Sequence, residues 1–233
     1  MYPLNKSQAN HYFTISVVLS KGHHHFGYAK LELVTSLLIL LPTVVGLLLW
    51  GSLPDQIATH FGTNNEADGW SSKPMAVIGL PVFMLAIQWL VFFLTSYDPK
   101  KKNINPKIFK VVLWLIPIIS IIVYLSTYMS ALGYGVNIGL LVNLLVGVVF
   151  IVLGNYLHKV KQNYTIGIRI PWTLNSKENW NRTNRLASWL FIISGLLFIL
   201  NAFLLQGWLL IIPIVAVVLV PFAYSFMMFK KGV

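Results

Sequence analysis

Nearly all the side chains that could recognise a ligand lie in two polar segments, and the first of these, residues 51–74, lies between two apolar stretches. Its sequence is GSLPDQIATHFGTNNEADGWSSKP. The candidate recognition residues are Asp55, His60, Glu66, Asp68 and Trp70. Carboxylates and an imidazole could bind a divalent cation or a cationic peptide, but neither a His-Glu-x-x-His motif nor EF-hand spacing is present. We therefore predict no metal site, and the alternative to a recognition surface is a solvated, locally hydrogen-bonded loop.

A second polar segment, residues 158–185, combines basic and aromatic side chains in the sequence HKVKQNYTIGIRIPWTLNSKENWNRTNR. Asn175 or Ser176 is expected to cap a helix whose first turn contains Glu178, the favourable charge at a helix amino terminus. Residues 167–174 are too apolar for a solvated connector, so they should fold against the protein or dock a partner. The docking candidates are Arg169, Pro171, Trp172, Trp180, Arg182 and Arg185, because Arg and Trp often dominate interface energies.

The remaining residues offer little other chemistry. The chain has no cysteine, which excludes disulfides and thiolate metal sites. Three adjacent histidines, residues 23–25, point in different directions and lack acidic neighbours, so we do not expect them to hold a metal ion. We expect residues 1–30 to form a cytoplasmic tail without fixed structure, or the start site to be assigned too far upstream. No nucleophilic triad or pair of membrane carboxylates is present, so we predict that the protein is not an enzyme and uses no cofactor.

These polar segments are separated by six apolar stretches, each long enough to cross a bilayer. The chain is 57% hydrophobic and 10% charged, whereas a soluble domain is about 25% charged. Both observations predict an all-α fold, a polytopic membrane bundle of six transmembrane helices. The expected spans are Leu33–Trp50, Met75–Leu94, Val111–Met129, Val136–Leu157, Leu186–Leu205 and Trp208–Phe229.

The basic residues predict the orientation of this bundle. Of 17 Lys and Arg residues, only Lys73 falls between the first and second, third and fourth, or fifth and sixth spans. The positive-inside rule then places both termini in the cytoplasm and residues 51–74 outside. The net charge of +11 follows from the same distribution, so the expected partner is the lipid bilayer and not nucleic acid. We divide the chain into a tail (1–30), a membrane domain with spans one to three (31–130) and a second membrane domain with spans four to six (131–233).

The span interiors are predicted to contain no ionisable side chain, with Glu32 and Lys110 at helix edges. Such groups usually mark proton and ion pathways, so their absence argues against ion-coupled transport. Amides remain, and we expect Gln88 and Asn201 to form hydrogen bonds between helices.

The fourth span has a regular pattern of small residues. Gly135, Gly139, Asn143 and Gly147 recur every four residues and so lie along one helix face. A ridge of this kind lets another helix backbone approach closely. We predict that this helix is central to the bundle.

Two segments resemble a known family. LPDQIATHFGTNNEADGWSSK is similar to the domain of unknown function at the front of SdpI-type immunity proteins. GNYLHKVKQNYTIGIRIPWTLNSKENWNRTNR is similar to the cytoplasmic loop typical of the same family. The resemblance extends from about Leu31 to the carboxyl terminus and includes the six-span layout.

The resemblance implies a protein of the bacterial plasma membrane that protects the cell from a secreted antimicrobial peptide of the SDP cannibalism-toxin kind. It also implies a receptor role, in which bound toxin outside leads the protein to hold a small winged-helix repressor at the membrane inside. The segment 51–74 would then recognise the toxin, and the segment 158–185 would dock the repressor. The alternative is a small-molecule or peptide transporter or exporter, because a bundle of this size could move an amphiphile.

Overall fold

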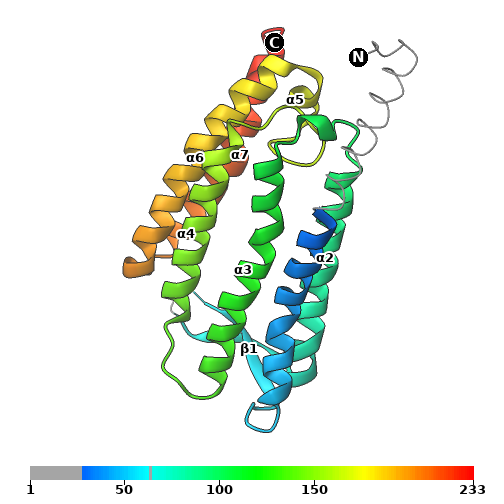
Figure 1. Cartoon of the computed structure of the whole chain (residues 1–233). Helices are drawn as coiled ribbons and strands as arrows, with labels where there is room; N and C mark the ends of the chain where they lie inside the picture. The colour runs from blue at the N-terminus through cyan, green and yellow to red at the C-terminus, as the bar shows by residue number, and fades with distance from the viewer. Residues whose placement is uncertain (1–27, 63–64) are drawn as a thin grey trace, which may run out of the picture.

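The computed structural model describes residues 28–62 and 65–233, and within them all six predicted spans are helices (Figure 1). The histidines at 23–25 lie outside the described residues. The chain is already helical at Tyr28, inside the predicted tail. The helices are Tyr28–Leu48, α2 (Leu80–Ser96, preceded by the π-helical turn η1, Met75–Gly79), α3 (Pro106–Ala131), α4 (Ile138–Leu157), α6 (Lys177–Leu204) and α7 (Trp208–Lys230).

The helices form two groups that lie side by side (Figure 1). The Tyr28–Leu48 helix, α2 and α3 make one group, and α4, α6 and α7 make the other, in which α4 and α6 have the most extensive contact. The short helix α5 (Pro171–Asn175) and the carboxyl terminus lie at one end of the bundle, which we call the α5 end. A β-hairpin lies at the opposite end, which we call the hairpin end.

The contact between α4 and α6 depends on glycines, two of which were not part of the predicted ridge. A Cβ atom on Gly147 would lie 2.7 Å from the carbonyl oxygen of Gly195, and one on Gly154 would lie 2.8 Å from that of Ser188. Distances this short leave no room for a side chain, so α4 and α6 meet backbone to backbone.

The amino-terminal part of the predicted ridge differs from the structure. Gly135 precedes α4, and a Cβ atom there would meet no atom of the described residues within 4 Å. Gly139 faces side chains, those of Asn65 and Leu205. Asn143 donates a hydrogen bond to the Gly139 carbonyl and accepts one from Asn201 of α6. The ridge was misplaced toward the amino terminus because a period of four residues drifts around a helix of 3.6 residues per turn.

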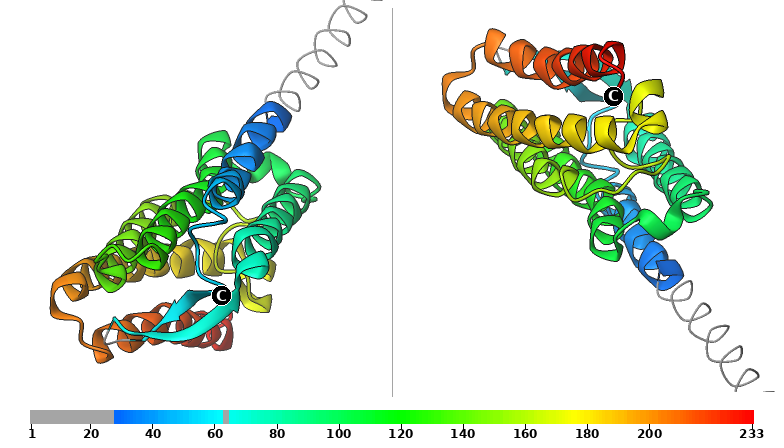
Figure 2. Two further views of the ribbon diagram at one scale, coloured as in Figure 1. Left: turned by 90° about the horizontal axis from the view of Figure 1, so that it is seen from below. Right: turned by 90° about the horizontal axis from the view of Figure 1, so that it is seen from above.

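The all-α prediction is wrong for residues 51–74, which fold as a two-stranded antiparallel sheet. Strand β1 (Gln56–Phe61) pairs with β2 (Ala67–Ser72), with Ile57 opposite Ser71 and Ala58 opposite Trp70. Leu53 and Ile57 are buried in a core cluster with Val77 of η1 and Tyr124 and Tyr128 of α3. The segment is therefore anchored on the bundle and is not a solvated loop. Seen from below, it runs across the end of the bundle toward α6 and α7 (Figure 2).

Candidate functional site

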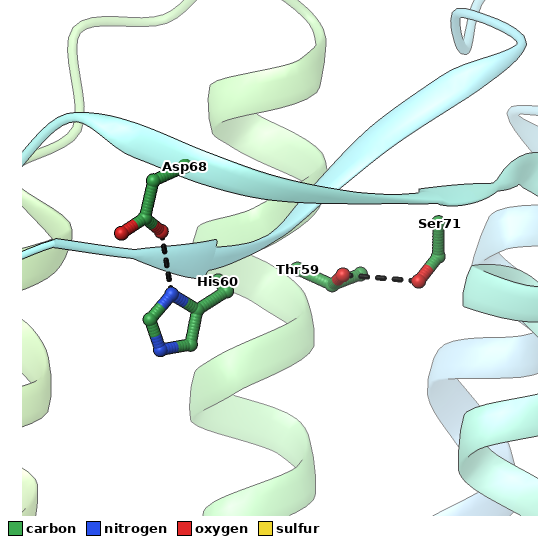
Figure 3. Close-up of polar contacts among 4 residues, drawn as sticks. All are labelled: Thr59, His60, Asp68 and Ser71. Atoms are coloured by element: carbon green, nitrogen blue, oxygen red, sulfur yellow. Dashed lines mark hydrogen bonds and ion pairs between the residues drawn. The ribbon is translucent and has the colours of Figure 1, made fainter.

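The hairpin displays the predicted recognition residues on its exposed surface. Nδ1 of His60 on β1 bonds the Asp68 carboxylate on β2 at 2.5 Å, and the Thr59 and Ser71 hydroxyls bond each other at 3.0 Å (Figure 3). Asp55 stands at the start of the hairpin, where Lys73 approaches its carboxylate to 3.2 Å. Pairing therefore brings His60 and Asp68 together but keeps Asp55 apart from them.

The other two predicted residues are also exposed. Glu66 lies at the turn that joins the strands, and Trp70 presents 58% of its surface. An exposed indole beside carboxylates suits an amphiphilic peptide, because it offers apolar contact area together with a hydrogen-bond donor. Among the described residues, no group of three or more His, Asp or Glu side chains could hold a metal ion.

A cavity of about 440 Å³ lies directly against β1 at the hairpin end. Residues 59–62 of β1 and the following turn form one wall, and α3, α4, α6 and α7 supply the others. Most of its surface is apolar, with a few amide and hydroxyl groups, which is the usual composition of a ligand pocket. The polar side chains of its helical walls are Ser126, Thr127, Asn143 and Asn201.

The two asparagines link three parts of the cavity wall. Asn201 of α6 donates to Asn143 of α4 at 3.0 Å and accepts from the backbone N–H of Gln206 at 2.8 Å. The hairpin joins the same network, because the Asn65 side chain accepts a hydrogen bond from the backbone N–H of Gly139. Asn65 was missed in the sequence, although a left-handed turn residue in the run Gly-Thr-Asn-Asn is typical of Asn.

At the α5 end, residues 158–176 form a folded cap and not an open loop. Asp98, which follows α2, accepts hydrogen bonds from the Tyr164 N–H at 2.8 Å and the Thr165 hydroxyl at 2.9 Å. Gln162 donates to the carbonyls of Thr173 and Leu174. Of the two alternatives expected for residues 167–174, the structure shows the first, in which they fold against the protein. The Ser176 cap of α6 is confirmed, since its side chain accepts from the Asn179 N–H.

Trp180 is not available for docking, so that prediction is wrong. The side chain is 0% exposed and its indole N–H donates to the Val160 carbonyl at 2.8 Å. Gly167 passes over the indole with a φ of +119°, a conformation that favours glycine. The indole packs in a small hydrophobic core with Ile108 and Val160. This packing explains why an otherwise polar segment contains a tryptophan.

The other docking candidates are exposed or half-buried. Arg169 donates to the Tyr164 carbonyl at 2.8 Å, and Arg182 pairs with Glu178 at 2.5 Å across one turn of α6. Pro171 and Arg185 are exposed. Trp172 is half-buried and packs on aromatic rings of α7, Phe222 and Phe226 among them.

Glu32 lies near the start of the Tyr28–Leu48 helix, as expected, but its side chain is buried inside the bundle. Glu32 is 0% exposed, and its carboxylate accepts a hydrogen bond of 3.1 Å from Gln88 of α2. The same amide donates to the carbonyl of Leu113, which has no helical partner because Pro117 lacks an N–H. The bundle therefore contains a buried ionisable group, and the sequence argument against ion-coupled transport loses its premise.

The helices and the hairpin-end cavity define a multi-pass membrane protein with a ligand-sized site at one end. Residues 159–225 match the model of the SdpI/YfhL protein family, and residues 37–85 match a domain of unknown function, DUF1648. The chain is 32% identical over 194 residues to "Immunity protein SdpI" of Bacillus subtilis (strain 168), covering 82% of this chain and 90% of that protein. The chain therefore belongs to the SdpI/YfhL family, which confirms the resemblance in its sequence. No solved structure gives a significant match.

Proposed function

We propose that this protein is an immunity protein of the bacterial plasma membrane that binds a secreted SDP-like antimicrobial peptide at its hairpin end. The observation that carries the proposal is the apolar cavity bounded by an exposed acidic hairpin. Family membership and the immunity relative point to the same activity.

The two parts of the site suit the two sides of an amphiphilic peptide. The hairpin segment 51–74 carries three carboxylates, Asp55, Glu66 and Asp68, against the single cation of Lys73, so it attracts a cationic peptide and speeds encounter. The cavity then receives an apolar part of the peptide, while Asn143 and Asn201 offer amides to its polar groups. Sequestering the peptide in this way keeps it from the lipid bilayer.

Tolerance of a sensitive bacterium tests this proposal. Expression of the protein should raise tolerance to an SDP-like peptide, and the triple variant Asp55→Asn, His60→Gln, Asp68→Asn should remove that gain at an unchanged protein level. The control is Gln56→Ala with Ser72→Ala, an uncharged exposed pair of the same hairpin, which should protect like the unchanged protein. Full protection by the triple variant would show that the hairpin carries no recognition.

The proposal requires the hairpin to face outside. The distribution of Lys and Arg predicts that reporters fused after Lys102 or Gly232 are cytoplasmic and that one inserted near Asn65 is external. Reporter activity on each side of the membrane measures this directly. An external reporter after Lys102 would reverse the orientation and place the cavity on the wrong side.

A repressor-docking role at the α5 end is part of the same proposal. The exposed side chain of Arg169 and the neighbouring Trp172 offer a basic and aromatic surface on the cap. Replacing both should leave peptide tolerance intact while a fluorescent winged-helix repressor no longer moves to the membrane. If the variant loses both peptide tolerance and repressor relocation at a normal protein level, these residues support the structure of the protein and do not form a docking site.

Transport is the second candidate, and the buried Glu32 favours it, because ionisable groups inside a bundle often lie on proton or ion pathways. Peptide flux into liposomes separates the two candidates. A transporter moves the peptide across the liposome membrane and loses this flux in Glu32→Gln. An immunity protein that acts by binding retains the peptide without flux.

A further inference from the structure

A second cavity, of about 460 Å³, lies at the α5 end between the last turn of α2 and the first turn of α3. Its inner wall is aromatic, since the Tyr28 and Phe109 rings lie 4.9 Å apart and Phe92 stacks on Phe109 at 6.1 Å. Its other boundary carries Lys101 and Lys102. The cavity therefore combines an apolar interior with two cations.

Lys101 and Lys102 have few polar partners among the described residues. The ammonium group of Lys101 donates only to the backbone carbonyl of Ser96, at 3.3 Å, and Lys102 makes no hydrogen bond or ion pair within the part of the chain that the structure describes. Lys100, in contrast, is bonded to Gln162 and lies over the Tyr164 ring. The nearby carboxylate of Asp98 is 3% exposed and accepts hydrogen bonds from backbone and hydroxyl donors. It therefore does not neutralise Lys101 and Lys102.

We propose that this cavity binds an anionic phospholipid. Its phosphate lies between the ammonium groups of Lys101 and Lys102, and one acyl chain packs against Phe92 and Phe109. The position fits, because α2 and α3 leave the membrane here, and aromatic and basic side chains gather at the level of lipid headgroups.

Charge decides between the possible occupants. A zwitterionic lipid would bring its own cationic group beside the two lysines. The chain that precedes Tyr28 carries Lys6 and Lys21 and no acidic residue, so it does not complement them either. Basic pockets between transmembrane helices are known to bind anionic headgroups.

Native mass spectrometry and thermal melting of the full chain in a neutral detergent test the proposal. Phosphatidylglycerol should bind one per chain and raise Tm, whereas phosphatidylcholine with the same acyl chains should do neither. A lysine at the headgroup level contributes about five-fold in affinity, so Lys101→Ala with Lys102→Ala should weaken phosphatidylglycerol binding about 25-fold. The control Lys159→Ala with Lys161→Ala removes the same charge from exposed positions at the same end and should bind as the unchanged protein does.

Three results would overturn the site. They are equal binding of both phospholipids, equal weakening by the two double variants, and saturation by glycerol phosphate without acyl chains, which would indicate a free phosphate site. If the double alanine variant does not fold, Lys101→Gln with Lys102→Gln replaces it, and Lys101→Arg with Lys102→Arg should retain binding because both charges remain.

Discussion

Replacing Gly147 with leucine should leave almost no folded protein in the membrane. A Cβ atom at this position would lie 2.7 Å from the Gly195 carbonyl oxygen and 3.1 Å from the Ile199 nitrogen, which are backbone atoms of α6. They cannot yield unless α4 and α6 separate, and this is the most extensive contact among helices α2 to α7. Alanine should show the same effect in milder form, because overpacking costs about 1–3 kcal/mol, or about 2–12 °C in Tm for a protein of this size.

Thermal melting and size-exclusion profiles in detergent measure this effect, and Gly135 provides the matched control. In the part of the chain that the structure describes, a Cβ atom on Gly135 meets nothing within 4 Å, so Gly135→Ala and Gly135→Leu should melt close to the unchanged protein. Similar losses at the two positions would mean that any added side chain disturbs this region. Normal stability of Gly147→Leu would show that α4 and α6 do not meet here.

Filling the hairpin-end cavity should remove peptide tolerance without unfolding the protein. Val142 of α4 lines the cavity and is 40% exposed, so the larger side chain of Val142→Trp can enter the space that the peptide would occupy. Tolerance of the sensitive bacterium should fall to that of cells without the protein, while the amount of protein in the membrane stays the same.

Val148 is the matched control for this variant. It lies on the same helix and is 53% exposed, but it does not line the cavity. Val148→Trp should therefore protect fully. Protection by Val142→Trp equal to that of the control would show that the cavity takes no part in immunity.

The six helices could be predicted from sequence because a bilayer requires long apolar segments, and that requirement leaves a pattern in composition alone. The hairpin has a weaker signal in the sequence. Its alternation of buried and exposed residues is short, and the burial of Leu53 and Ile57 depends on α3, which is far away in the sequence. The charged candidates of this segment are exposed, as charged side chains without a buried partner usually are, and their role in recognition stays a prediction.

The errors at the α5 end and at Glu32 have a common physical cause, because both concern polar or aromatic groups that are buried by partners outside their own helix. Buried positions in α6 include Trp180, Thr183, Asn184, Ala187 and Ser188, spaced by three and four residues. This spacing marks one helix face and could have shown that Trp180 points inward. Glu32 lies on a buried face of the same spacing, together with Thr35, Ser36 and Ile39. Its partner Gln88 is 56 residues away, so the spacing does not identify the hydrogen bond between them.

Direct binding of a fluorescent SDP-like peptide to the purified protein in nanodiscs tests the central claim, that the hairpin-end cavity is the recognition site. The unchanged protein and Val148→Trp should bind the peptide saturably with the same affinity, and Val142→Trp should bind it at least about ten-fold more weakly, a loss of about 1.4 kcal/mol. No saturable binding by the unchanged protein, or equal affinity for all three, would contradict the claim.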